Sequence, residues 1–170
     1  MSVVATPDQI AERHRLGLDR FDEIWDGRYH VNAAPHPRHS FLLRYAERLL
    51  DERAEAQGLV PLGEFNIGTP TDYRIPDAGY VDTLPTEAFV PTARLVIEVL
   101  SPNDETLSKL PFYARHRVDE VLLIAPETRT VTWLALDELR TVYSTAERSA
   151  LLHLSADDVS ARLPWNLIDP

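Results

Sequence analysis

Two helices are predicted in the N-terminal half of the chain, the first from its end signals and the second from hydrophobic residues at helical spacing. Residues 6–17 predict a first helix, in which Thr6 caps the N-terminus, Pro7 occupies the first turn and Gly17 ends the helix. A second helix is predicted from about His39 to Gln57, and Gly58 is a natural stop. Its apolar residues form one stripe at helical spacing: Phe41, Leu42, Tyr45, Leu49 and Leu50.

Shorter apolar runs between and after these helices predict strands. Phe21–Trp25 and Tyr29–Asn32 flank an Asp26-Gly27 pair, which is a strong signal for a hairpin turn. Two further strands are expected around Glu64–Ile67 and Ala78–Val81, followed by a surface loop over residues 82–91 that contains two prolines.

The C-terminal half alternates strand, helix and strand. A strand at Arg94–Leu100, a helix from about Glu105 to Arg117 and a strand at Glu120–Ala125 predict a crossover unit with two parallel neighbouring strands. A strand at Thr130–Leu136 follows a turn, and Thr141–Ser144 suits an edge strand. The tail to residue 170 reads as weakly structured, with apolar residues docking on the core: Leu151, Leu152, Leu154, Leu163 and Trp165. The pattern therefore predicts one α/β domain over residues 1–170, with a mixed sheet flanked by helices and a core at about 19–144.

Composition narrows the function classes. The net charge of −10 argues against tight, non-specific binding of nucleic acid, although it does not exclude a local basic groove. The chain has no cysteine, which excludes disulfides, thiolate metal sites and cysteine nucleophiles. No apolar run is long enough to span a bilayer, and the N-terminus lacks the pattern of a secretory signal. These features lead us to expect a cytoplasmic protein.

Two carboxylates stand out against this background. Glu98 lies in the middle of an apolar strand, where a charge is costly unless something compensates it. An ion pair with an arginine would compensate it, and so would a divalent cation. Asp77 follows Pro76 at the start of another predicted strand, where a turn residue is the simpler interpretation.

Lys109 adds a cation to this pair of carboxylates. It lies about one turn into the helix that follows the Glu98 strand, so that its long side chain could reach back over the strand end. A solvated helix lysine is the alternative. Two carboxylates on adjacent strands could hold Mg²⁺, which would polarise a phosphate, while the lysine orients a water or stabilises developing charge. This combination is typical of phosphodiester hydrolysis.

The order of these residues resembles the PD-(D/E)XK nuclease superfamily, which has the restriction-endonuclease-like fold. It is most similar to a large bacterial family of small predicted restriction endonucleases, formerly a domain of unknown function. The resemblance runs from about residue 19 to 136 and rests on the following motifs: Glu23 before Asp26-Gly27, Pro35-His36-Pro37 before His39, Pro76-Asp77, Glu98-Val99-Leu100-Ser101-Pro102, Lys109 with Tyr113, and Val118-Asp119-Glu120.

This resemblance implies a Mg²⁺-dependent endonuclease, with Mn²⁺ as an alternative cation and DNA as the expected substrate. Asp77 and Glu98 are the expected metal ligands and Lys109 the residue that positions the water. Glu23 would add a further carboxylate to the site. His39 would contact phosphate or assist proton transfer. A homodimer is expected from the pairing common among such nucleases.

One departure from the superfamily concerns the lysine. The usual motif places it two positions after the glutamate, where this chain has Leu100, so Lys109 is expected to supply the ammonium from the following helix.

The alternative hypothesis is a catalytically inactive nuclease fold that serves as a binding or assembly module. Hydrolysis of a different phosphate ester is a third possibility, because the same metal site would allow it. Tyr113, one helical turn beyond Lys109, could orient the lysine, but core packing is the favoured role. Ser101 is expected to be a helix-entry or turn residue, since it lacks the sequence context of a nucleophile.

Overall fold

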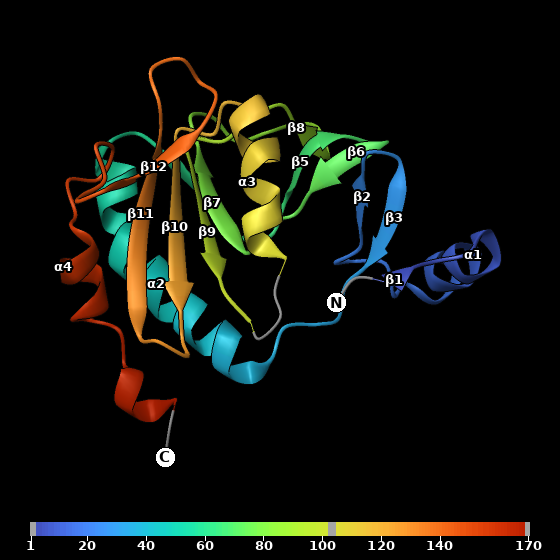
Figure 1. Ribbon diagram of the computed structural model, residues 1–170, viewed down its shortest axis with the longest axis horizontal. Helices are drawn as coiled ribbons and strands as arrows, with labels where there is room; N and C mark the ends of the chain where they lie inside the picture. Colours follow the sequence, from blue (N-terminus) through green and yellow to red (C-terminus); the bar gives the residue numbers. More distant parts are fainter. Residues whose placement is uncertain (1–2, 102–104, 169–170) are drawn as a thin grey trace.

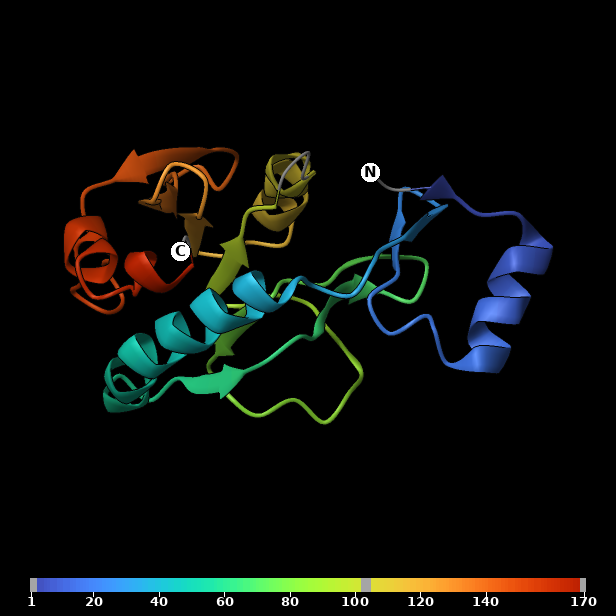
Figure 2. The ribbon, with the colours of Figure 1, turned by 90° about the horizontal axis from the view of Figure 1, so that it is seen from below.

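The computed structural model (Figures 1 and 2) describes residues 3–101 and 105–168. Its helices are α1 (Pro7–Leu16), α2 (Pro37–Ala56), α3 (Thr106–Arg115), α4 (Ala156–Ser160) and the 3₁₀ helix η1 (Trp165–Leu167). Its strands are β1 (Val3–Val4), β2 (Glu23–Trp25), β3 (Arg28–Val31), β4 (Val60–Leu62), β5 (Asn66–Thr69), β6 (Asp72–Arg74), β7 (Ala78–Val81), β8 (Phe89–Val90), β9 (Leu95–Val99), β10 (Glu120–Ala125), β11 (Thr130–Leu136) and β12 (Tyr143–Ala146). None of the helices in this part of the chain has the length and apolar character needed to cross a membrane.

The strands form two mixed sheets. The main sheet has the strand order β12-β11-β10-β9-β7-β4, in which β9 and β10 are parallel and the other neighbours are antiparallel. The second sheet has the order β1-β3-β2-β6-β5-β8. The predicted α/β class with a mixed sheet and flanking helices is confirmed, and the structure adds that the strands divide between two sheets.

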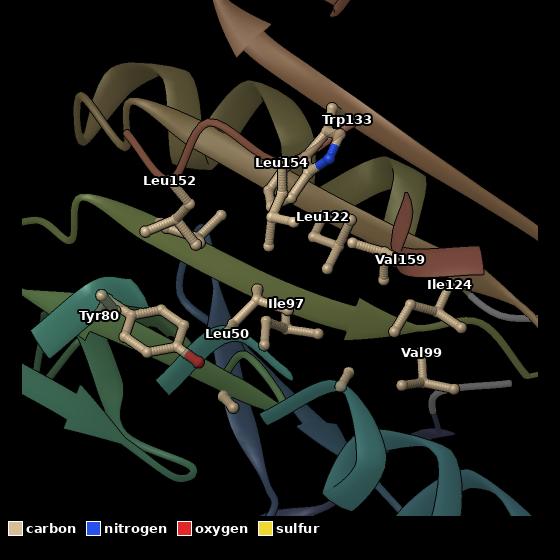
Figure 3. Close-up of a cluster of buried hydrophobic side chains, with 14 of the residues drawn as sticks. Leu50, Tyr80, Ile97, Val99, Leu122, Ile124, Trp133, Leu152, Leu154 and Val159 are labelled. Atoms are coloured by element: carbon tan, nitrogen blue, oxygen red, sulfur yellow. The ribbon is translucent and has the colours of Figure 1, made fainter. Parts of the chain in front are cut away.

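The main sheet has a helix on each face, with α2 on one side and α3 on the other (Figures 1 and 2). Helix α2 presents its buried residues at four-residue spacing: Leu42, Ala46, Leu50 and Ala54. They pack against Tyr80, Ile97 and Leu122 of the sheet (Figure 3). On the opposite face, Phe112 and Tyr113 of α3 pack with Val96 and Val121.

The alternation along β9 explains the position of Glu98. Leu95, Ile97 and Val99 point into the core beneath α2, whereas Val96 points to the α3 face. Successive side chains of a strand alternate between faces, so Glu98 shares the α3 face with Val96. The buried carboxylate thus lies between β9 and α3.

The local signals at several element boundaries act as expected. Thr6 and Gln9 form a capping box at the start of α1, and Gly17 ends the helix at a φ of 64°. Asp26 and Gly27 both have positive φ, 48° and 78°, as a tight turn between β2 and β3 requires.

Other boundaries differ from the predictions. Helix α2 begins at Pro37, with His36 as its N-cap, because proline suits the first turn of a helix. The short strands β1, β4, β6 and β8 were not predicted, and β8 falls inside the expected loop over residues 82–91. The edge strand is β12, two residues later than expected. The tail contains α4 and η1, while Leu152, Leu154 and Leu163 are buried as predicted. Of the predicted loop before α3, residues 102–104, which include Pro102 of the family motif, lie outside the described residues.

Candidate active site

Asp77 and Glu98 are brought together by the pairing of β7 with β9. These strands are antiparallel, with Ala78 opposite Ile97. Continuing this register by one residue places Asp77 opposite Glu98, and directly opposite residues share a face of the sheet. The backbone confirms the proximity, because Val99 N–H donates to Asp77 Oδ2 at 2.7 Å.

Lys109 reaches the same face from α3. Its Nζ lies 3.5 Å from Glu98 Oε1 and 3.1 Å from Glu23 Oε1, and it donates to the Ile75 carbonyl at 3.0 Å. The side chain is only 12% exposed. Burial lowers the pKa of this amine, but the negative charges of Glu98, Glu23 and Asp77 outweigh burial and raise it above the ordinary value. Lys109 therefore carries a positive charge in the pocket.

Glu98 is among the most deeply buried charged groups of the described residues. Tyr113 O–H donates to its Oε1 at 2.5 Å, and the side chain is 3% exposed. Burial raises the pKa of Glu98 to about 8; Asp77 and Glu23 add to this effect, while Lys109 and Tyr113 oppose it. If Glu98 is neutral, it no longer raises the pKa of Lys109, but the charges of Glu23 and Asp77 still do. The site thus favours added positive charge.

Glu23, at the start of β2, has both carboxylate oxygens engaged. Oε1 accepts from Ile75 N–H at 2.6 Å and lies beside Lys109, while Oε2 accepts from Trp25 Nε1–H at 2.7 Å. The sequence suggested a further metal-site carboxylate at this position. The geometry places Glu23 beside Lys109, and its role towards a metal stays a prediction.

His39 lies in the first turn of α2, beside Asp77. Its Nε2 is 3.0 Å from Asp77 Oδ2, and its Nδ1 is 3.5 Å from Ser101 Oγ. The angle at Nε2 does not satisfy hydrogen-bond geometry, so this buried nitrogen has no hydrogen-bond partner among the described residues. The ring therefore approaches Asp77 closely without a hydrogen bond, and it lines the pocket, where a ligand could reach it.

All five residues singled out from the sequence line one open pocket of about 360 Å³. Its walls come from β2, from the chain leading into α2, from the start of β7, from the end of β9 and from the first turns of α3. Phe21, Trp25 and Pro35 supply apolar surface around the charged groups. The pocket is thus lined from both sheets: β2 belongs to one, and the start of β7 and the end of β9 belong to the other.

The donor atoms suit a cation held by two carboxylates. Over residues 3–101 and 105–168, neither Asp77 Oδ1 nor Glu98 Oε2 takes part in a hydrogen bond. Mg²⁺ is commonly bound through one or two carboxylates and retains several waters. The same residues contain no group of three or more His, Asp or Glu side chains arranged to hold a metal. A divalent cation at this place would be held by the carboxylates of Asp77 and Glu98 together with water.

Sequence reasoning missed two neighbours of these residues, Trp25 and Arg74. Trp25 bonds Glu23 directly, and the Arg74 guanidinium lies over the Trp25 ring at 4.4 Å. Sequence reasoning also left one signal unused, because Lys109 is the only lysine among 17 Lys and Arg residues. Among the described residues Tyr113 makes no hydrogen bond to Lys109; it packs in the core and donates to Glu98.

Comparisons with known proteins bear on the family and the fold of the chain. The profile of a family described as "Uma2: Putative restriction endonuclease" matches residues 14–162. Among solved structures, the chain is similar to a protein from Anabaena variabilis ATCC 29413 described as "a putative nuclease belonging to DUF820". The two share 16% sequence identity with a TM-score of 0.67, over 85% of this chain and 90% of that one. No curated protein sequence matches this chain. The family match covers most of the sequence, and the chain belongs to the Uma2 family, in agreement with its resemblance to the restriction-endonuclease-like superfamily.

Proposed function

We propose that this protein is a Mg²⁺-dependent endonuclease that hydrolyses phosphodiester bonds in DNA. The family description and the fold support a nuclease-like role. The observation that carries the proposal is the position of the only lysine. Although position 100 is leucine, Lys109 Nζ lies 3.5 Å from Glu98 Oε1, on the face that Asp77 shares.

Asp77 and Glu98 would hold the divalent cation, through the carboxylate oxygens that make no hydrogen bond in the described structure. A bound cation supplies Lewis-acid polarisation of the scissile phosphate. Lys109 brings a fixed positive charge to the same pocket, where it would stabilise the negative charge that develops on the phosphate oxygens. His39 Nε2 would contact a phosphate oxygen or move a proton at the leaving group.

Cleavage assays with matched variants test this proposal. Purified protein is incubated with supercoiled plasmid, linear DNA and RNA, with Mg²⁺ or Mn²⁺ and with EDTA. Asp77→Asn and Glu98→Gln should each abolish metal-dependent cleavage, because they remove a ligand charge at nearly constant side-chain size. Glu127→Gln, in an exposed turn, is the control and should cleave like the unmodified protein. Absence of cleavage of all three substrates with both metals would refute the catalytic claim.

An inactive nuclease fold that serves as a binding or assembly module is the alternative. The net charge of −10 and the missing lysine at position 100 favour it. Calorimetric titration with Mg²⁺ or Mn²⁺ separates the two functions. Metal binding that is lost in Asp77→Asn supports the enzyme, whereas no binding at millimolar metal supports the module.

The same preparations test the remaining expectations. Cleavage of a simple phosphodiester such as bis(p-nitrophenyl) phosphate, without cleavage of DNA or RNA, would indicate a different phosphate ester as substrate. Sedimentation equilibrium tests the homodimer. The choice of DNA over RNA, the homodimer and the cytoplasmic location stay predictions.

A further inference from the structure

Four planar side chains stack beside the pocket and connect β2, β3, β6 and α3. The Trp25 and His30 rings are stacked, with centroids 4.5 Å apart and planes inclined by 17°. The guanidinium carbon of Arg74 lies 4.4 Å from the Trp25 ring centroid and 4.2 Å from that of Phe112. The aromatic stack formed by these residues, His30, Trp25, Arg74 and Phe112, thus reaches from the small sheet to the helix that bears Lys109.

Arg74 is the centre of the aromatic stack. It is 2% exposed, and its Nη1 donates to Asp72 Oδ1 at 2.9 Å and to the Ile24 carbonyl at 2.8 Å. Its Nε has no hydrogen-bond partner among the described residues. A buried guanidinium is stabilised by aromatic faces when these replace water around it. Arg74 therefore fixes the planes of Trp25 and Phe112 relative to each other.

Glu23 connects the aromatic stack to Lys109, because it contacts both Trp25 and the lysine. Trp25 Nε1–H donates to Glu23 Oε2 at 2.7 Å, so the position of the indole determines the position of the carboxylate. Glu23 Oε1 lies 3.1 Å from Lys109 Nζ. Ile75, the residue that follows Arg74, bonds both partners: its N–H donates to Glu23, and its carbonyl accepts from Lys109.

We propose that Trp25 is a positioning residue of the site: its indole N–H, held in place by the aromatic stack, orients Glu23, which in turn holds the Lys109 ammonium against Glu98. This inference rests on the proposed nuclease function for its kinetic consequence, but its structural consequence does not require turnover.

The first test observes Lys109 directly. Because the chain has one lysine, protein labelled with [¹³C,¹⁵N]-lysine gives a single set of side-chain NMR signals. In the unmodified protein the two ε-protons should be inequivalent, since the ammonium is held in one position. Trp25→Phe keeps a ring in the aromatic stack but removes the N–H donor, and it should shift these signals and merge the two ε-protons. Trp165→Phe removes another indole hydrogen bond, to the Ser160 carbonyl, and should leave the lysine signals unchanged.

The second test uses a double-mutant cycle on cleavage. Losing a hydrogen bond to a charged group corresponds to roughly a tenfold change, so Trp25→Phe should lower kcat about tenfold with KM unchanged. If Trp25 acts through Glu23, then Trp25→Phe should change kcat by less than about twofold in a Glu23→Gln background. Thermal unfolding of Trp25→Phe should match that of Trp165→Phe.

The outcomes separate the two proposals. Unchanged Lys109 signals in Trp25→Phe overturn the positioning role, whatever the kinetics show. Equal losses in kcat with and without Glu23 also overturn it, because the effect of Trp25 would then not pass through Glu23. If the unmodified protein cleaves no substrate, the proposed function fails, and the NMR comparison alone decides the role of Trp25.

Discussion

The stability of the fold should depend on pH through Glu98. Its carboxyl group is buried between β9 and α3, and burial raises its pKa from 4.5 to about 8. A carboxyl whose pKa is higher in the folded than in the unfolded state stabilises the fold fully at low pH. That contribution is fully present below about pH 4.5 and is lost as the pH rises towards 8. Glu98→Gln should remove this dependence, because a neutral amide does not titrate.

The size of the effect follows from the shift. A rise from 4.5 to about 8 corresponds to at most about 5 kcal/mol of unfolding free energy. That value already includes the opposing effects of Lys109 and Tyr113, so the measured change should amount to a few kcal/mol and not exceed this limit. Even that value is a large fraction of the stability of a typical domain.

Urea unfolding at intervals from pH 4.5 to 8.5 measures the effect, with the two proteins compared at each pH. The unfolding free energy of the unmodified protein minus that of Glu98→Gln should decrease steadily over this range. Glu127→Gln serves as the control, since its side chain is exposed and its difference from the unmodified protein should stay constant. At pH 8.5, Mg²⁺ should stabilise the unmodified protein more than Glu98→Gln, because only the former keeps both carboxylates.

A difference that does not change with pH would refute this reasoning. Glu98 would then stay ionised over the whole range, with Lys109 and Tyr113 compensating its charge in full. The site would in that case have no deficit of positive charge, and the electrostatic argument for a cation between Asp77 and Glu98 would lose its basis.

Three further predictions concern single substitutions. Lys109→Met leaves the carboxylates around it without a cation and should lower the unfolding free energy by about 3–5 kcal/mol in urea at pH 7, with most of the loss recovered in a Glu23→Gln background. Glu120→Ala removes the acceptor of three hydrogen bonds from residues 149–151; it should cost about 3 kcal/mol and increase amide hydrogen exchange in the C-terminal segment, without changing cleavage. Gly79→Ala would bring a Cβ to 2.7 Å from the Leu95 carbonyl oxygen; about 1–3 kcal/mol should be lost, measured by thermal unfolding, and an unchanged melting temperature would contradict the observed strand spacing.

The elements predicted best are those with a long periodic pattern or a specific turn signal. The β9–α3–β10 unit follows from an apolar strand, an amphipathic segment and a second apolar strand, and the hairpin β2–β3 follows from Asp26-Gly27. Strands β4 and β8 have three and two residues, which is too short for alternation to be visible. The division of the strands into two sheets depends on pairings between distant segments, such as β5 with β8, which no local pattern encodes.

In the candidate site, too, contacts between residues distant in sequence could not be predicted. The resemblance to a known family pointed to Asp77, Glu98 and Lys109 together, and the structure places them on one face of the sheet. Arg74 could not be identified in this way, because it follows Asp72-Tyr73 in a polar stretch with no signal of burial. Its burial depends on Trp25 and Phe112, which are distant in sequence and approach it only in the folded chain.

The use of a lysine at position 109, in a chain that otherwise uses arginine, has a geometric reason. An ammonium group has three N–H donors around one compact charge, and three acceptors surround Lys109 Nζ: the Ile75 carbonyl, Glu23 and Glu98, at 3.0, 3.1 and 3.5 Å. A planar guanidinium presents its donors as a fork and would not fit these directions. The longest of the three contacts is the one to Glu98, so it is the contact that Lys109 would exchange most readily for a phosphate oxygen. Glu23 and Ile75 would keep the ammonium in place during this exchange, which is why the residues that hold Glu23 matter as much as those that would hold the metal.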